Sequence, residues 1–145
     1  MAPTPLRHID PDETDPEIVL IVRSCVLAPA VARAFVRSGV ALLGWTESED
    51  AVLLTSEAVS NSVEHAHSKA VEVSLRRHGR LVRVGVTDDD PIVPEMAPLD
   101  PTAVGGFGLR LIDLLSDEWG IEVVKGDGKC VWFEIALPIA TPAIP

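Results

Sequence analysis

Three polar side chains recur at every fourth residue of one segment: Glu57, Asn61 and His65. In a helix this spacing drifts by only about 40° per step, so the three groups would share one side. An amide oxygen suits Mg²⁺, a carboxylate one turn earlier can accept a proton, and an imidazole can donate to a phosphate. A solvated helix face would carry the same row. The other residues of this segment, however, are rich in Ala, Val and Leu. This composition predicts a mostly buried helix, in which the side chain of Asn61 needs a hydrogen-bond partner.

A second acidic cluster, Asp88, Asp89 and Asp90, follows an alternating apolar run and precedes Pro91. An acidic turn at the end of a strand accounts for such a cluster. Alternatively, Asp88 at the last strand position presents a carboxylate to a donor on a ligand, for example the amine of an adenine. The residues by themselves leave both interpretations open.

A third feature is the run of glycines at 105, 106 and 108, which surrounds Phe107 just before an apolar helical pattern. Glycines let the backbone approach a ligand closely, and a helix N-terminus directs N–H groups at an anion. A simple turn would look the same, and Phe107 would then be a core aromatic. The run lacks the lysine and spacing of a P-loop and the preceding strand of a Rossmann turn, so neither of those motifs is present.

Hydrophobic periodicity predicts the elements that position these groups. A β-branched strand and two helices come first, and Thr46 and Glu49 form a T-x-x-E pattern that predicts a capping box for the second helix. Two hairpins follow, separated by a Pro-rich loop and a third helix. The expected strands are 17–25, 70–76, 81–87, 119–125 and 129–137, and the first two helices span about 29–43 and 47–66. This order predicts an α+β two-layer sandwich, with helices on one face of a mixed, mostly antiparallel sheet.

The length of 145 residues predicts one domain over 17–138, with a flexible acidic leader at 1–16 and a flexible tail at 139–145. The net charge of −10 disfavours binding to nucleic acid or to an acidic membrane. A ligand that carries phosphates would therefore need a metal ion or backbone N–H groups. We expect a cytoplasmic protein, because neither a signal peptide nor an apolar run of membrane length is present. Its two cysteines predict no disulfide framework.

Taken in order, the motifs resemble the sequence boxes of the GHKL ATPases, and most closely those of the small anti-sigma-factor serine kinases. The resemblance covers about residues 17–137. The segments that carry it are SEAVSNSVEHA (56–66), VRVGVTDDDP (82–91), GGFGLRLIDLLSDEWGIE (105–122) and GKCVWFEI (128–135). It implies the Bergerat fold of histidine-kinase-like ATPases, with ATP and Mg²⁺ as ligands.

The resemblance also implies a role for each motif. Asn61 would hold Mg²⁺, Glu57 would act as catalytic base, Asp88 would recognise the adenine amine and 91–104 would form the ATP lid. Asp90 stands where the superfamily has Gly, in a turn for which Asp tolerates left-handed backbone better than most residues. The full set of expected ATP-binding residues is Asn61, His65, Asp88, Asp90, Gly105, Gly106, Phe107, Gly108, Leu109 and Lys129.

The implied function is a Mg²⁺-dependent protein serine/threonine kinase that acts as an anti-sigma factor. It would transfer the γ-phosphate of ATP to a small antagonist (anti-anti-sigma) domain and would also bind a sigma factor. The resemblance suggests a homodimer as well, and the first helix and strand are the expected docking surfaces. The alternative is a nucleotide-binding module that regulates a partner by docking without catalysis; Glu57 favours catalysis, because a pure binder does not need it. A sensor histidine kinase fragment is disfavoured, because no phospho-accepting helical hairpin is evident.

Overall fold

The computed structural model describes residues 16–46, 48–65, 68–91, 108–124 and 128–137. The expected tail and nearly all of the expected leader lie outside these ranges. The order of elements is the predicted one. The elements are β1 (Glu17–Arg23), α1 (Ala28–Leu42), α2 (Glu49–His65), β2 (Ala70–His78), β3 (Leu81–Asp88), α3 (Gly108–Leu115), β4 (Glu118–Val124) and β5 (Gly128–Ala136).

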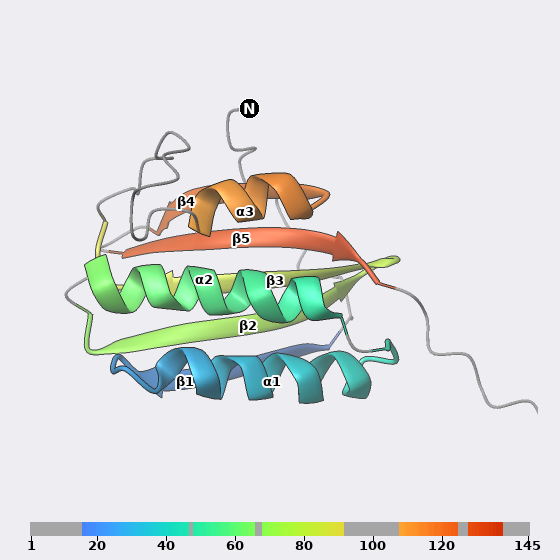
Figure 1. The fold of residues 1–145 in the computed structure, drawn as a ribbon, viewed down its shortest axis with the longest axis horizontal. Coiled ribbons are helices and arrows are strands. Elements are labelled where there is room, and N and C mark those ends of the chain that lie inside the picture. Colours follow the sequence, from blue (N-terminus) through green and yellow to red (C-terminus); the bar gives the residue numbers. More distant parts are fainter. Residues whose placement is uncertain (1–15, 47, 66–67, 92–107, 125–127, 138–145) are drawn as a thin grey trace, which may run out of the picture.

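The five described strands form one sheet in the order β1-β2-β3-β5-β4. Each pairing between them is antiparallel. The described helices lie on one face of this sheet, with α1 over the β1–β2 edge and α2 near its middle (Figure 1). The predicted α+β two-layer fold is therefore confirmed, and the parallel pairings that a mixed sheet would contain are absent from the described strands.

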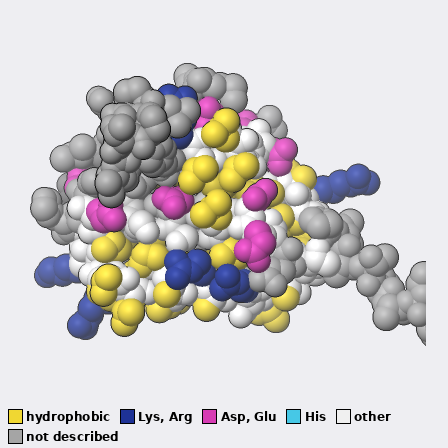
Figure 2. Space-filling model, viewed as in Figure 1, with side chains coloured by type: hydrophobic (Ala, Val, Ile, Leu, Met, Phe, Trp, Pro, Cys, Tyr) yellow, Lys and Arg dark blue, Asp and Glu magenta, His cyan; other side chains and the backbone are white. Residues whose placement is uncertain are grey.

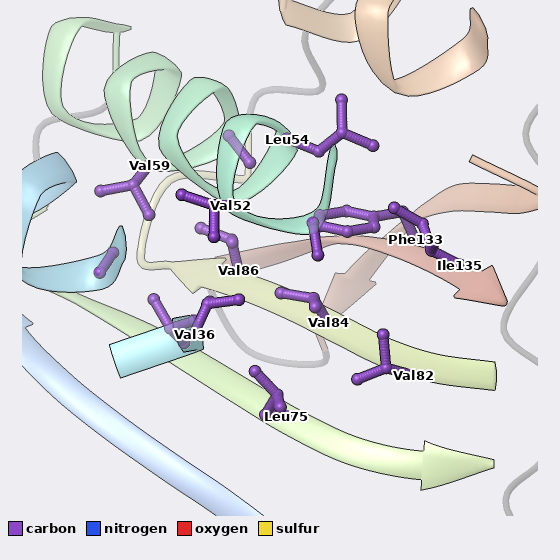
Figure 3. Packing of buried hydrophobic residues seen from close by; sticks show 14 of the residues in the cluster. Val36, Val52, Leu54, Val59, Leu75, Val82, Val84, Val86, Phe133 and Ile135 are labelled. Carbon is purple, nitrogen blue, oxygen red and sulfur yellow. The ribbon is translucent and has the colours of Figure 1, made fainter. Parts of the chain in front are cut away.

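The hydrophobic core fills the space between the helices and the sheet. Alternate residues of β3, Val82, Val84 and Val86, are buried and project toward α1 and α2 (Figure 3). Strand register places the same alternation on β5, because Val86 pairs with Val131 and Val84 with Phe133. The intervening residues of each strand consequently face away from the helices.

The start of α2 differs from the prediction. The helix begins at Glu49, and the Ala51 N–H donates to the Ser48 side chain at 3.3 Å. Ser48 is thus the N-cap, and the predicted capping box of Thr46 and Glu49 is wrong. The T-x-x-E pattern predicted the wrong N-cap because Ser48, two positions later in the chain, is an equally good capping residue.

The outer surface of the helical layer keeps several large hydrophobic side chains exposed, among them Val31, Leu53 and Leu114. Figure 2 shows hydrophobic side chains between acidic ones on this side of the molecule. Leu115, at the end of α3, is 37% exposed, whereas Leu109 and Ile112 on the same helix are buried. None of the described helices is both long enough and apolar enough to cross a membrane.

Candidate functional site

The side chain of Asn61 lies against the first residue of α3. A Cβ atom built on Gly108 would lie 2.6 Å from Nδ2 of Asn61, so any larger residue at position 108 would displace the carboxamide from its present place. The carboxamide therefore lies at the N-terminal end of α3, where backbone N–H groups have no partner within the helix. In the part of the chain that the structure describes, the Asn61 side chain makes no hydrogen bond.

The next residue of α2 contacts the end of β3. The Ser62 hydroxyl donates to Oδ2 of Asp88 at 2.8 Å, and both side chains are buried. Two consecutive residues of α2 thus touch the other two predicted motifs, Asn61 the start of α3 and Ser62 the end of β3. Stretches far apart in the sequence meet at one place in the fold.

Asp88 also carries a buried ion pair. Lys129 lies opposite it in the β3–β5 register, and Nζ is 2.9 Å from Oδ1 of Asp88. The two side chains are 9% and 1% exposed, respectively. Burying a lone carboxylate would be very unfavourable, and the ammonium offsets that penalty. Lys129 is therefore bound to Asp88 and is not a free cation on the surface.

The same two residues fix the turn that follows β3. The Asp90 N–H donates to Oδ1 of Asp88, and the Asp90 carbonyl accepts from Nζ of Lys129, both at 2.9 Å. The Asp89 N–H donates to Oγ of Ser68 at 2.8 Å. No described residue other than glycine has a positive φ. The turn at Asp90 thus does not need the left-handed backbone that Asp would tolerate, because hydrogen bonds to the side chains of Asp88 and Lys129 hold it.

Glycine at the start of β5 makes the ion pair possible. A Cβ on Gly128 would collide with the carbonyl oxygen of Asp88. Without a side chain there, the β5 backbone can run close beside the end of β3 and bring Lys129 opposite Asp88. Gly128 thus contributes to the site indirectly, because it allows Lys129 to lie opposite Asp88.

The Asp88 carboxylate retains capacity for a ligand. An ionised carboxylate has about four acceptor positions. Among the described residues, Lys129 and the Asp90 N–H use Oδ1, and Ser62 uses Oδ2. One acceptor position on Oδ2 therefore remains for a donor such as an amine.

The other predicted site residues fall into two groups. Glu57 is half-buried on α2, one turn before Asn61, and Leu109 packs into the hydrophobic core. The remaining ones lie outside the described residues. They are the side chain of His65, Gly105, Gly106 and Phe107. Residues 92–104 of the expected lid also lie outside them.

Sequence reasoning missed Ser62, Ser68 and Gly128 as contributors to this site. Ser62 carried a usable signal, because it lies three residues after the buried Val59 and so interrupts the apolar stripe of α2 with a polar group. Ser68, just before β2, and Gly128, at the start of β5, contribute only through contacts between distant segments, which local sequence does not show.

A divalent cation at this site would have to use few protein ligands. The described residues contain no group of three or more His, Cys, Asp or Glu side chains that could hold a metal ion. Mg²⁺, however, keeps several waters and takes oxygen ligands from bound phosphates, so a single carboxamide oxygen is a sufficient protein contribution. The Asn61 side chain, which has no hydrogen bond to another described residue, fits that requirement.

Comparison with known proteins places the chain among ATPase domains. Residues 23–135 match the sequence model of the histidine kinase-like ATPase domain. An uncharacterised protein of Streptomyces coelicolor is 34% identical over 100 residues, which cover 62% of this chain and 93% of that protein. The crystal structure of the RsbU and RsbW domains of Rv1364c from Mycobacterium tuberculosis is similar with a TM-score of 0.64 at 24% identity. The match covers 87% of this chain and 35% of that chain, so the present chain spans about a third of that structure.

Proposed function

Because this chain belongs to the histidine kinase-like ATPase domain family, we propose that it binds ATP with Mg²⁺ and phosphorylates a serine or threonine of a partner protein. The observation that carries the proposal is the pair of contacts made by successive residues of α2. Asn61 lies against Gly108, and Ser62 binds Asp88. These contacts support the proposal because they bring the carboxamide of Asn61, the N-terminal end of α3 and the carboxylate of Asp88 close together.

Asp88 would recognise the adenine ring. Its remaining acceptor position on Oδ2 suits the exocyclic amine of adenine, whereas guanine has a carbonyl oxygen at the same ring position. Ser62 and Lys129 hold the carboxylate from two sides. The acceptor is therefore fixed in place before the nucleotide arrives, which reduces the entropy lost on binding.

The phosphates would lie toward the start of α3. The chain carries a net charge of −10, so a polyanion needs local compensation. The N-terminal end of α3 supplies N–H groups and the positive end of the helix dipole. Asn61 would hold Mg²⁺ beside it, and the cation would offset the charge of the phosphates.

Glu57 is the candidate base for the transfer. It lies one turn before Asn61 on α2, and the spacing of four residues puts both on one side of the helix. The partner hydroxyl would attack the γ-phosphorus, the bond to the leaving ADP oxygen would break, and the hydroxyl proton would pass to Glu57. Phosphoryl transfer depends mainly on positioning and charge stabilisation, so this small set of groups is sufficient.

We further propose that the protein substrate is a small antagonist domain and that a sigma factor is a second partner. Support comes from the likeness in fold to a structure that contains an RsbW domain. β1 is an edge strand, and Ile21 on it is 70% exposed. Ile21 faces away from the helices, because its neighbours Leu20 and Val22 pack against the core. Val31 on α1 is exposed on the helical side, so the first strand and helix offer a partner apolar side chains on opposite faces of this edge.

The test compares Glu57→Gln with Glu64→Gln, a matched control on an exposed position of the same helix. ATP binding is measured by calorimetry, and transfer by incubating γ-labelled ATP with a candidate antagonist domain. We expect both variants to bind ATP as the wild type does, and only Glu57→Gln to lose transfer by 100-fold or more, a typical effect of removing a general base (about 10²–10⁴). Equal transfer by both variants would contradict the role of Glu57. ATP binding without transfer by the wild type would favour the non-catalytic docking module.

A further inference from the structure

The face of the sheet turned away from the helices carries a row of charges that crosses all five strands. Strand register aligns Glu17, Arg76, Arg83, Glu134 and Glu118 in that order. Two arginines are thus direct cross-strand neighbours. Like charges in directly opposite positions destabilise a sheet, so this pair needs a compensating interaction.

The ion pairs of the two arginines satisfy only part of their hydrogen-bonding capacity. Arg83 is 6% exposed, with Nη1 3.6 Å from Oε1 of Glu134 and its guanidinium 4.0 Å above the ring centre of Trp132. Arg76 reaches Oε2 of Glu17 with Nη2 at 3.4 Å. In the described part of the chain, Nε and Nη2 of Arg83 and Nε of Arg76 are buried with no hydrogen-bond partner. Burial also lowers the pKa of Arg83, and the negative charge of Glu134 acts against this shift.

A cavity of about 120 Å³ is lined by the two arginines that carry these unpaired donors. Its wall includes both arginines, Glu17, Ser74, Cys130 and Trp132. The space exists because the residue between Ser74 and Trp132 in the register is Gly85. A Cβ there would lie 2.8 Å from Oγ of Ser74 and 3.2 Å from Sγ of Cys130.

Among the described residues that line this cavity, the buried side-chain atoms without a hydrogen-bond partner are all donors. Besides the three guanidinium nitrogens, Nε1 of Trp132 is buried without a partner among the described residues. Guanidinium and indole groups can only donate, so the complementary ligand is an acceptor. Burying donors without an acceptor is unfavourable, so an acceptor brought against these groups would be stabilised by them.

The charges around the cavity indicate which kind of acceptor it can bind. Glu17 and Glu134 already pair with the arginines, and Glu118 and Glu122 add negative charge that acts on Arg83. These carboxylates would repel a phosphate with two negative charges more strongly than a carboxylate with one. The planar carboxylate also matches the parallel N–H groups of a guanidinium.

We propose that this cavity binds a carboxylate group between Arg76 and Arg83, over the glycine at position 85. A cavity of roughly 150 Å³ holds a benzene-sized molecule, so the site suits a short acid or the side chain of an aspartate or glutamate from a bound peptide. The site lies on the opposite face of the sheet from Asn61 and Asp88. It is therefore independent of the proposed nucleotide site.

The test follows the indole N–H resonances in a ¹H–¹⁵N spectrum of the whole protein. The resonance of Trp132 is assigned by its loss in Trp132→Phe, and the probes are sodium propionate and a blocked tripeptide with a central glutamate. Propionamide and sodium chloride serve as controls for shape and ionic strength. We expect a saturable shift of the Trp132 resonance with propionate, with the tripeptide or with both, and none with either control.

Variants show whether the arginines are responsible. Arg83→Met and Arg76→Met should each weaken the shift at least tenfold, and Arg80→Met, an exposed arginine in the β2–β3 turn, should leave it unchanged. Because Arg83→Met also leaves Glu134 buried without its partner, the more exposed Arg76 provides the second variant. A shift with propionate indicates a free acid as ligand, and a shift with the tripeptide alone indicates a polypeptide side chain. No shift with either probe, or an equal shift with propionamide, would overturn the proposal, whatever the result for ATP.

Discussion

The buried carboxylate of Asp88 is bound by the ammonium of Lys129, which lies directly opposite it in the β3–β5 pair with 2.9 Å between Oδ1 and Nζ. The same ammonium binds the carbonyl of Asp90. One cation therefore neutralises the proposed adenine-recognising group and closes the turn behind it. The same ion pair therefore stabilises the fold and holds the carboxylate of the proposed adenine site in position.

Removing this ammonium should destabilise the protein strongly. Lys129→Met leaves Asp88 buried and unpaired, and breaking a buried pair in this way costs about 3–5 kcal/mol. Urea unfolding measures the loss, and Lys69→Met, at an exposed lysine, is the matched control with little expected change. The double variant Asp88→Asn/Lys129→Met should regain part of the loss, since no unpaired charge remains. A single variant as stable as the wild type would show that the pair contributes nothing.

A methyl group at the start of α3 should displace the Asn61 carboxamide. In Gly108→Ala the added Cβ would lie 2.6 Å from Nδ2 of Asn61, too close for the side chain to stay in place. We expect ATP affinity in the presence of Mg²⁺ to fall about tenfold or more, which is about 1.4 kcal/mol. Calorimetry measures the affinity.

The matched control for this change is Gly39→Ala. Gly39 is also helical, and its added Cβ would approach only the flexible end of Leu75, at 3.3 Å. Its affinity for ATP should equal that of the wild type. Equal affinity in Gly108→Ala as well would mean that the position of the carboxamide does not matter for the nucleotide.

Alkaline pH should reveal the environment of Cys130. Burial raises the pKa of this thiol above its ordinary value of 9.0, with Glu122 acting in the same direction and Thr87 and Arg83 against it. The folded state then holds the proton more tightly than the unfolded state. This contribution to stability is complete below the unfolded pKa and is lost as the pH rises through 9 toward the folded value.

Replacing the thiol should remove this loss. Between about pH 8 and pH 10, the free energy of unfolding should decline less steeply in Cys130→Ala than in the wild type or in Cys25→Ala, which keeps the thiol in question. Urea titrations at each pH give the slopes. Parallel slopes in all three proteins would contradict a raised pKa at Cys130.

Much of the fold was predictable because its signals are local. The alternation of apolar residues in β2 and β3, and the Gly79 turn between them, predict that hairpin directly, and Gly79 has the positive φ of 62° that a tight turn favours. The order of elements followed from the same reasoning. The exact start of α2 did not, because Thr46 and Ser48 are both good capping residues and only the hydrogen bond to Ser48 distinguishes them.

The site was predictable as a set of motifs, but not as a network of contacts. Asn61, Asp88 and Gly108 stood out by their residue types and spacing. Ser62 and the pairing of Lys129 with Asp88 depend on helix packing and strand register, which bring together residues 26 and 41 positions apart. The pair of arginines on the opposite face could not be predicted for the same reason. In the sequence, Arg76 and Arg83 are ordinary polar positions of their strands, and only the register makes them neighbours.

The central claim is that three distant stretches form one site for ATP with Mg²⁺. Calorimetric titration of ATP, with and without Mg²⁺, tests it most directly when the wild type is compared with Asn61→Ala and with Ser60→Ala, a control one position earlier on α2. The account predicts metal-dependent binding in the wild type and in Ser60→Ala, and its near-complete loss in Asn61→Ala. The same affinity in all three proteins, or binding in the wild type that is indifferent to Mg²⁺, would contradict it.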